Sequence, residues 1–140
     1  MRLPSNKFIA PALFVLFLDQ IIKFLAIQKI IALEFSGNSG ALFGVQLSTS
    51  FVFVFFAVFL FVAIISFKKD EFKNSAISIA AFYLMLGGIV SNLADRILYG
   101  QIIDYIDLFN LFSFNIADLA ICFSALILSW KVLICKNCDL

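Results

Sequence analysis

The sequence predicts an all-α membrane protein, a bundle of four transmembrane helices with a small β element outside the membrane. The first observation is composition: 64% of the 140 residues are hydrophobic and 19 are Phe, whereas soluble domains are about 45–50% apolar. The second is the presence of four long apolar stretches. The third is a polar segment, residues 87–118, set in an otherwise apolar chain. The length suits one compact domain spanning residues 1–140.

Four apolar stretches approach or reach the length of about 20 residues that crosses a bilayer. They are Phe8–Ile27, Phe51–Phe67, Ala76–Leu98 and Asn115–Ile134. We expect all four to be helices, because lipid cannot satisfy the hydrogen bonds of an open backbone. The first stretch resembles a signal peptide, because basic residues precede it. However, polar residues follow its apolar run, and no small-x-small cleavage site is evident. We therefore expect this segment to be retained.

The basic residues predict the orientation of these helices. They cluster before the first stretch, between the second and third, and at the end of the chain, as Arg2, Lys7, Lys68, Lys69, Lys73, Lys131 and Lys136. The positive-inside rule then places both termini in the cytoplasm and leaves two outer segments, at about residues 28–50 and 99–114. With this topology the aspartates, the asparagines, Lys23 and Arg96 that are singled out as site residues all lie toward the outer membrane face. A transporter would instead place its ionisable site near the midplane.

The first outer segment has a pattern typical of β structure. Leu33 and Phe35 alternate with polar residues, residues 36–40 (Ser-Gly-Asn-Ser-Gly) predict a turn, and an apolar run resumes at residues 41–45. Two interpretations stay open. The element is either a hairpin lying on the lipid surface or a platform for a bound peptide, to which Asn38 would offer its amide.

The composition of the chain excludes several kinds of catalysis and metal binding. Histidine is absent, which excludes Ser–His and Cys–His catalysis and zinc bound by histidine. Cys135 and Cys138 form a Cys-x-x-Cys, but two thiols cannot complete a tetrahedral zinc site, so we interpret them as reduced thiols of a cytoplasmic tail. The net charge of +1 indicates no nucleic-acid partner.

Ionisable residues among membrane spans usually mark function, because an unpaired charge there is costly. Asp19 and Lys23 are spaced i, i+4, the favourable order for an ion pair, and we interpret them as structural. Asn92, Asp95 and Arg96 share one helical face. A structural salt bridge between Asp95 and Arg96, or from either to a neighbouring loop, is one interpretation. In the other, Asn92 and Arg96 donate to a substrate carbonyl or a lipid head group.

Asn115 and Asp118 begin the fourth stretch. Asn115 has the features of a helix N-cap, and Asp118 would favour the positive helix end. That explanation leaves the further aspartates just upstream without a role. Two neighbouring carboxylates share a proton, and such a pair can perform aspartic-protease chemistry. The residues themselves leave open whether Asp95, Asp104 or Asp107 is the partner of Asp118.

Five motifs in this order resemble one family, the lipoprotein signal peptidases (signal peptidase II). The motifs are Asp19-x-x-x-Lys23, Asn38-x-Gly40-Ala41-x-Phe43, Gly87-Gly88 through Asn92-x-x-Asp95-Arg96, Gly100 with Asp104, and Phe114-Asn115-x-Ala117-Asp118. Each motif alone is weak. Together, between four spans of suitable orientation, they are specific, and they cover nearly the whole chain.

The resemblance implies a bacterial inner-membrane aspartic endopeptidase that cuts prolipoproteins on the amino side of a diacylglyceryl-modified cysteine, at the periplasmic face. It implies a catalytic pair and no metal or other cofactor, with lipid-modified prolipoprotein and membrane lipids as partners of a monomer. It also implies a small periplasmic β cradle, and a flexible loop or short helix before the fourth span. By motif, the implied catalytic residues are Asp104 and Asp118, the substrate-binding residues Asn38, Asn92, Arg96 and Asn115, and the supporting residues Asp19, Lys23 and Asp95.

Two positions depart from the family pattern: Ser91 stands where glycine is usual, and Leu42 where alanine is usual. Neither touches the implied catalytic pair. Two other classes of function remain as alternatives. A small proton-coupled four-helix transporter would also need carboxylates in the membrane, and a non-catalytic membrane scaffold would leave the grouping of aspartates without a cause.

Overall fold

The computed structural model describes residues 9–38, 41–42, 45–46, 75–109 and 112–133. Within these residues the chain forms three helices and six short strands. They are α1 (Ile9–Ile27), β1 (Ser36–Asn38), β2 (Ala41–Leu42), β3 (Val45–Gln46), α4 (Ala76–Tyr99), β4 (Ile102–Asp104), β5 (Ile106–Leu108), β6 (Phe112–Phe114) and α5 (Ile116–Leu133). The expected span Phe51–Phe67 and the two tail cysteines lie outside the described residues.

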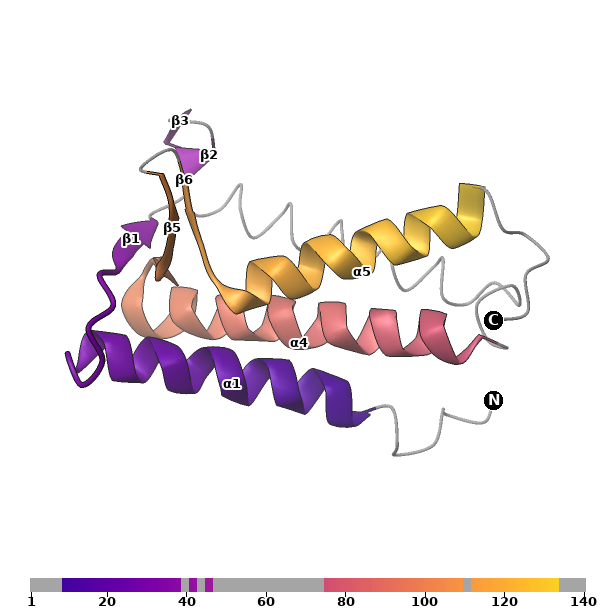
Figure 1. Cartoon of the computed structure of the whole chain (residues 1–140), viewed down its shortest axis with the longest axis horizontal. Helices are drawn as coiled ribbons and strands as arrows, with labels where there is room; N and C mark the ends of the chain where they lie inside the picture. The colour runs from indigo at the N-terminus through magenta and orange to yellow at the C-terminus, as the bar shows by residue number, and fades with distance from the viewer. Residues whose placement is uncertain (1–8, 39–40, 43–44, 47–74, 110–111, 134–140) are drawn as a thin grey trace.

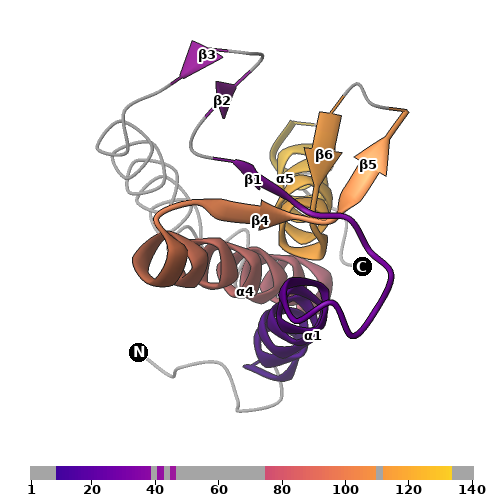
Figure 2. The same cartoon turned by 90° about the vertical axis from the view of Figure 1, so that its left-hand side faces the viewer.

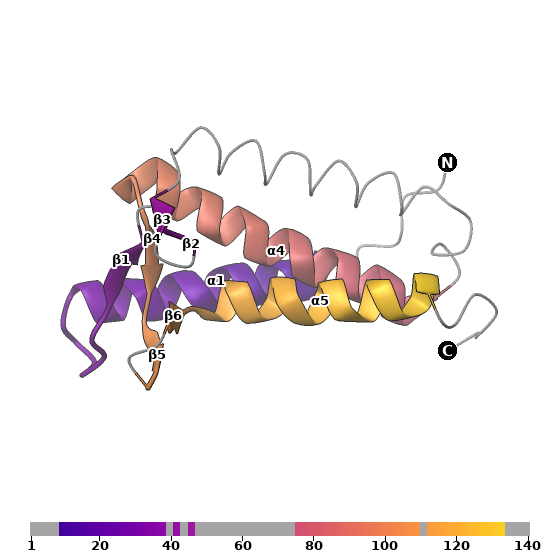
Figure 3. The ribbon, with the colours of Figure 1, turned by 90° about the horizontal axis from the view of Figure 1, so that it is seen from above.

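The three helices lie lengthwise beside one another, and the strands gather at one end of them (Figure 1). We call this the strand end. Helices α1 and α4 both run toward it and α5 runs away from it (Figures 1 and 3). Seen end-on, α4 neighbours both other helices, and β1 and β4 cross the helix ends (Figure 2). The end of α4 and the start of α5 therefore meet under the strands.

Two adjacent glycines allow α4 to approach both of its neighbours closely. A Cβ atom on Gly87 would lie 2.4 Å from the carbonyl oxygen of Ala12 in α1, and one on Gly88 would lie 2.6 Å from that of Ala117 in α5. Small residues at such crossings are typical of membrane helices, whose association depends on close packing. Phe82, Met85 and Ile89 of α4 form a buried apolar core, against which Ile121 and Leu128 of α5 pack.

The helix bounds agree with the apolar stretches to within one residue. Helix α4 begins after Ser75, whose hydroxyl accepts a hydrogen bond from the Ser78 N–H, and ends at Gly100, which has the left-handed φ of 71°. Glycine adopts that conformation without steric cost, so it suits a helix end. Among the described residues, α1 and α4 are long and apolar enough to cross a membrane, with mean hydropathies of 1.9 and 1.8.

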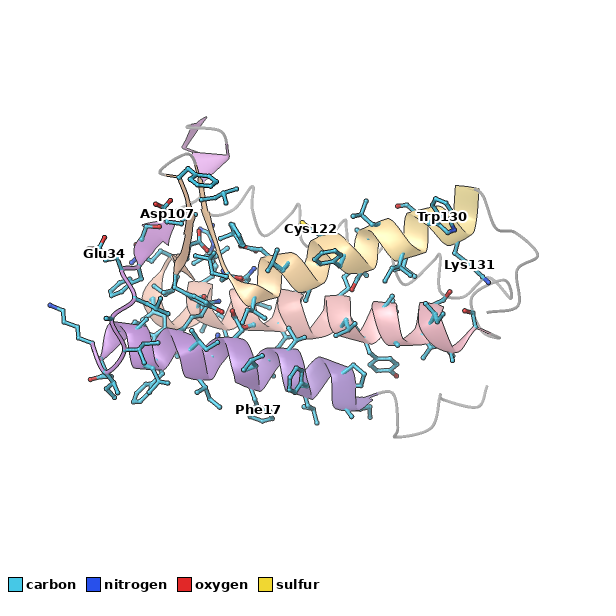
Figure 4. The ribbon with its side chains drawn as sticks, in the orientation of Figure 1. Phe17, Glu34, Asp107, Cys122, Trp130 and Lys131 are labelled. Carbon is cyan, nitrogen blue, oxygen red and sulfur yellow. The ribbon has the colours of Figure 1, made fainter. Side chains whose placement is uncertain are left out.

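The outward faces of these helices are strongly apolar. On α1 the exposed side chains include Phe14, Phe17, Ile21 and Phe24, and Phe17 projects from the side of α1 opposite α4 (Figure 4). On α5 they include Phe123, Leu126 and Trp130. A continuous apolar exterior of this size is typical of a protein surrounded by lipid.

The strands correct two expectations for the outer segments. The predicted turn over residues 36–40 is wrong for its first three residues, which form β1 and pair antiparallel with β4, with Ser36 opposite Asp104 and Asn38 opposite Ile102. The described part of residues 99–114 contains β4, β5 and β6 in place of a loop or short helix, with β5 and β6 paired as a hairpin. Pairing with a distant strand outweighs the local turn preference of Ser, Gly and Asn.

Candidate active site

Most of the buried polar side chains of the described residues lie at the strand end of the bundle. They include Asp19, Lys23, Ser91, Asn92, Asp95, Arg96, Asp104 and Asn115, each at most 6% exposed. Buried charges are tolerated only when they are paired and hydrogen-bonded. The partners of each group therefore indicate how the site is built.

Lys23 is the cation at the base of this site. Its ammonium lies 2.5 Å from Asp19 Oδ2 and 2.6 Å from Asp95 Oδ2, and it also donates to Asn92 Oδ1 at 3.2 Å. The ion pair expected between Asp19 and Lys23 is therefore present. Because Asp95 belongs to α4, the same ammonium also ties α1 to α4 beneath the site.

The suggested salt bridge between Asp95 and Arg96 does not form. Asp95 instead accepts from Lys23, from Gln20 Nε2 at 2.8 Å and from the Ile103 N–H at 3.2 Å. Adjacent residues on a helix point in different directions, so Asp95 and Arg96 do not face each other. The Nε and Nη1 atoms of Arg96 have no hydrogen-bond partner within the described part of the chain, although the side chain is only 6% exposed.

Asp19 joins three parts of the chain through its two carboxylate oxygens. Oδ2 accepts from the Ser91 hydroxyl at 2.7 Å, and Oδ1 accepts from the Tyr105 hydroxyl at 2.8 Å and from the Ala117 N–H at 3.3 Å. Burial raises the pKa of the Tyr105 phenol, and the neighbouring carboxylate of Asp19 raises it further. Tyr105 therefore keeps its proton and acts as a donor to Asp19.

Tyr105, Ser91 and Gln20 also belong to this network, although no motif in the sequence assigns them to it. In the sequence Ser91 is only a departure from the family pattern. In the structure its hydroxyl donates to Asp19 and accepts from Gln20 Nε2 at 2.9 Å. A signal was available for Ser91, because it lies four residues before Asp95 and so on the same face of α4. No such periodicity marks Tyr105, which lies between two strands.

The first turn of α5 holds Asp118 in a fixed position. The Asp118 N–H donates to Asn115 Oδ1 at 2.9 Å, and the Asn115 N–H donates to Asp118 Oδ2 at 3.3 Å. This is the reciprocal pattern of a capping box, so the predicted N-cap role of Asn115 is confirmed. The other carboxylate oxygen of Asp118, Oδ1, accepts from Asn92 Nδ2 at 2.7 Å. Asp118 is thus held from both α4 and its own helix.

Asn115 also connects Asp118 to Asp104. Its side-chain amide Nδ2 donates to Asp104 Oδ1 at 2.8 Å, with longer contacts of 3.2 Å to Asn92 Oδ1 and 3.3 Å to the Ile103 carbonyl. One asparagine therefore contacts both carboxylates, Asp104 through its side chain and Asp118 through its backbone N–H. Asp104 in turn is placed by the pairing of β4 with β1.

The remaining predicted residues lie apart from this contact. Asp107 is exposed on β5, where it pairs in register with Ser113, and it projects among the strands away from the helices (Figure 4). Asp95 is held by Lys23. The structure therefore brings Asp104 into contact with Asn115, which also contacts Asp118, and it leaves Asp107 exposed on β5. The backbone of Asn38 is in β1, and its side chain lies outside what the structure describes.

The arrangement has the groups that peptide hydrolysis needs. Asn115 contacts both carboxylates, and a guanidinium with two unpartnered nitrogen atoms lies at the end of the same helix as Asn92. Two carboxylates held close together share a proton and can supply both a general base and a general acid. No group of three or more His, Cys, Asp or Glu side chains suited to a metal occurs in the described ranges.

The chain is similar over most of its length to known peptidases. The family described as signal peptidase (SPase) II matches residues 11–134. A lipoprotein signal peptidase of Moorella thermoacetica is 32% identical, over 91% of this chain and 93% of its own, and one of Halalkalibacterium halodurans is 29% identical, over 87% and 88%. A solved bacterial membrane enzyme superimposes with a TM-score of 0.76 at 27% identity, over 93% of this chain and 88% of its own. The chain therefore belongs to the signal peptidase II family of membrane peptidases.

Proposed function

We propose that this chain removes signal peptides from diacylglyceryl-modified prolipoproteins, cutting on the amino side of the lipidated cysteine as an aspartic endopeptidase. The catalytic pair is Asp104 and Asp118. The relatives named lipoprotein signal peptidase support the substrate class. The observation that carries the choice of residues is the double contact of Asn115 with Asp104 Oδ1 and Asp118 Oδ2.

The mechanism follows from a pair that holds one proton between two carboxylates. The ionised carboxylate takes a proton from a water molecule as the water oxygen attacks the scissile carbonyl carbon. The protonated carboxyl gives its proton to the carbonyl oxygen, so the tetrahedral intermediate forms without a free oxyanion. As the intermediate collapses, the C–N bond breaks, the amine nitrogen takes up a proton from the pair, and one hydroxyl of the intermediate returns its proton to the pair, which restores the starting state. Such a pair titrates as a unit.

Substrate-binding roles go to Asn38, Asn92, Arg96 and Asn115. Arg96 has the clearest support, because a buried guanidinium leaves two nitrogen atoms without acceptors in the described structure. Leaving such donors unpaired is unfavourable, and a peptide carbonyl or a lipid ester would satisfy them. Asn92 and Asn115 act mainly by holding the two aspartates, and Asp19, Lys23 and Asp95 support them from below.

The membrane placement is part of the same proposal. Residues 1–140 form one domain with four spans, the second being Phe51–Phe67, in the bacterial inner membrane. Both termini are cytoplasmic, the strand end faces the periplasm, and the monomer is the active unit among membrane lipids. A substrate anchored by two acyl chains and its own signal helix remains in the membrane, so it reaches the site by lateral diffusion. A site at the helix ends, beside the strands, suits a substrate that arrives this way.

The transporter alternative is not favoured. The family match identifies peptidases. Asp104 lies in β4 and Asp118 in the first turn of α5, so both members of the proposed pair are at the strand end. A scaffold without catalysis would not need Asp104 and Asp118 on the same asparagine.

The decisive experiment is cleavage of a diacylglyceryl-modified precursor by the purified enzyme in detergent, followed as the shift of precursor to product on a gel. Asp104→Asn and Asp118→Asn should each abolish cleavage while keeping the circular dichroism spectrum of the wild type. The matched control is Asp107→Asn, which changes an exposed aspartate in the same segment and should keep cleavage within about twofold. Retained cleavage in either Asp104→Asn or Asp118→Asn would disprove the assignment of the pair. The unmodified precursor, without its lipid, should be cut poorly.

A further inference from the structure

Tyr105 is a buried residue next to Asp104, one member of the proposed catalytic pair. It directly follows Asp104, is 5% exposed, and lies between β4 and β5. Its hydroxyl donates to Asp19 Oδ1 at 2.8 Å and accepts from the Ile116 N–H at 3.1 Å. Its backbone N–H donates to the Phe114 carbonyl at 3.2 Å. One residue thus contacts α1, the start of α5 and the strand that leads into α5.

The contact with Ile116 bears directly on the position of Asp118. The first N–H groups of a helix have no partner within the helix and must find one outside. In α5 the Ile116 N–H donates to the Tyr105 hydroxyl, and the Ala117 N–H donates to Asp19 Oδ1. Since Tyr105 also donates to Asp19 Oδ1, the hydroxyl and the carboxylate together hold the first turn of the helix that carries Asp118.

We propose that the Tyr105 hydroxyl is a positioning group that sets the separation of Asp104 and Asp118. The connection is short: Asp104 is joined covalently to Tyr105, and the hydroxyl of Tyr105 is hydrogen-bonded to the second residue before Asp118. The Asn115 bridge fixes the orientation of the two carboxylates, whereas the Tyr105 bridge fixes how far β4 stands from the start of α5. The inference rests on the proposed function, since it concerns the geometry of that catalytic pair.

Removing only the hydroxyl tests this role. In Tyr105→Phe the ring still fills its buried space, but Ile116 loses its hydrogen-bond partner and Asp19 Oδ1 loses one donor. Displacement of a catalytic group by about 1 Å can cost up to about 100-fold in rate. We expect kcat for the lipidated precursor to fall at least tenfold, while KM stays within about twofold because the substrate-binding side chains are unchanged.

Ser91→Ala provides a matched control. It also removes one hydroxyl donor to Asp19, at 2.7 Å, but this donor is on α4, and the partners of the hydroxyl, Asp19 and Gln20, are both on α1. Gln20 Nε2, which donates to the Ser91 hydroxyl, keeps acceptors in Asp95 Oδ1 and the Ser91 carbonyl. Both variants should lose stability by similar amounts. Only Tyr105→Phe should lower kcat by tenfold or more.

The assay uses the full chain at a temperature well below the unfolding midpoint of both variants, with Asp118→Asn as the inactive reference. If Tyr105→Phe keeps kcat within twofold of the wild type, or if Ser91→Ala lowers kcat equally, the hydroxyl is only one of several stabilising contacts and the inference is wrong. If Tyr105→Phe fails to fold while Ser91→Ala folds, the hydroxyl has a general structural role and the inference is equally wrong. Failure of the wild type itself to cleave would instead refute the proposed function.

Discussion

Replacing Lys23 with methionine should destabilise this protein more than any other conservative change in the site. Lys23 is 1% exposed and forms ion pairs with Asp19 and Asp95, each fully buried, at 2.5 and 2.6 Å. Lys23→Met keeps a similar side-chain volume but leaves two buried carboxylates without their cation. Removing one partner of a buried ion pair costs about 3–5 kcal/mol.

The expected loss can be measured as a shift of the thermal unfolding midpoint in detergent. For a chain of this size, a loss of 1 kcal/mol lowers the midpoint by about 3 °C, so Lys23→Met should lower it by about 10 °C or more. Hydrogen bonds from Ser91, Tyr105 and Gln20 remain in place. These neutral donors stabilise the carboxylates only partly, because they carry no compensating charge.

Two further variants separate the charge effect from loss of packing. Lys29→Met changes an exposed lysine near the end of α1 and should leave the midpoint within about 2 °C. The triple variant Asp19→Asn, Lys23→Met, Asp95→Asn removes all three charges and should be more stable than Lys23→Met alone. If Lys23→Met unfolds within about 3 °C of the wild type, or if the triple variant is no more stable than Lys23→Met, the pairing of these buried charges does not determine the stability of the protein.

Three other predictions follow from single contacts. Gly88→Ala should lower the unfolding free energy by about 1–3 kcal/mol, and with it the unfolding midpoint, because the new Cβ would lie 2.6 Å from a backbone carbonyl oxygen. Val90→Ala, at an exposed position of the same helix, should change the midpoint little. Asn115→Ala should abolish cleavage. Ser75→Ala, which removes the N-cap of α4, should cost about 1 kcal/mol in denaturant unfolding and keep cleavage. An unfolded tyrosine ionises near pH 10, but folded Tyr105 keeps its proton to higher pH. The unfolding free energy should therefore fall as pH rises above about 10, and fall less steeply in Tyr105→Phe.

Several features of the site were predictable because they depend on residues close in sequence. The i, i+4 spacing of Asp19 and Lys23 predicted their ion pair, which is present. The N-cap of α5 at Asn115 was predictable from an asparagine placed before an apolar run, and its hydrogen bonds confirm it. The helix ranges followed from apolar length alone, since a membrane span must exceed a minimum length.

Features that depend on distant pairing were not predictable. Residues 36–38 have a local composition typical of a turn, yet they form β1 because β4 offers a strand partner. The second partner of Lys23, Asp95, lies on another helix, so no spacing in the sequence relates the two. Tyr105 has an apolar ring and no periodic context, and only its position between Asp19 and the start of α5 gives its hydroxyl a role.

By itself the sequence determined that this is a membrane protein, that the three apolar stretches within the described residues are helical, and that most of its polar site residues gather toward one end of them. Those properties follow from hydropathy and helical periodicity, which act over short distances along the chain. Residue patterns left Asp95, Asp104 and Asp107 as equal partners for Asp118. Their contacts in the tertiary structure differ: Lys23 engages Asp95, Asp107 is exposed on β5, and Asn115 contacts both Asp104 and Asp118, which supports the proposed pair. The reason is physical: the role of a buried carboxylate depends on the hydrogen-bond donors that surround it. Folding brings those donors together from separate elements of the chain.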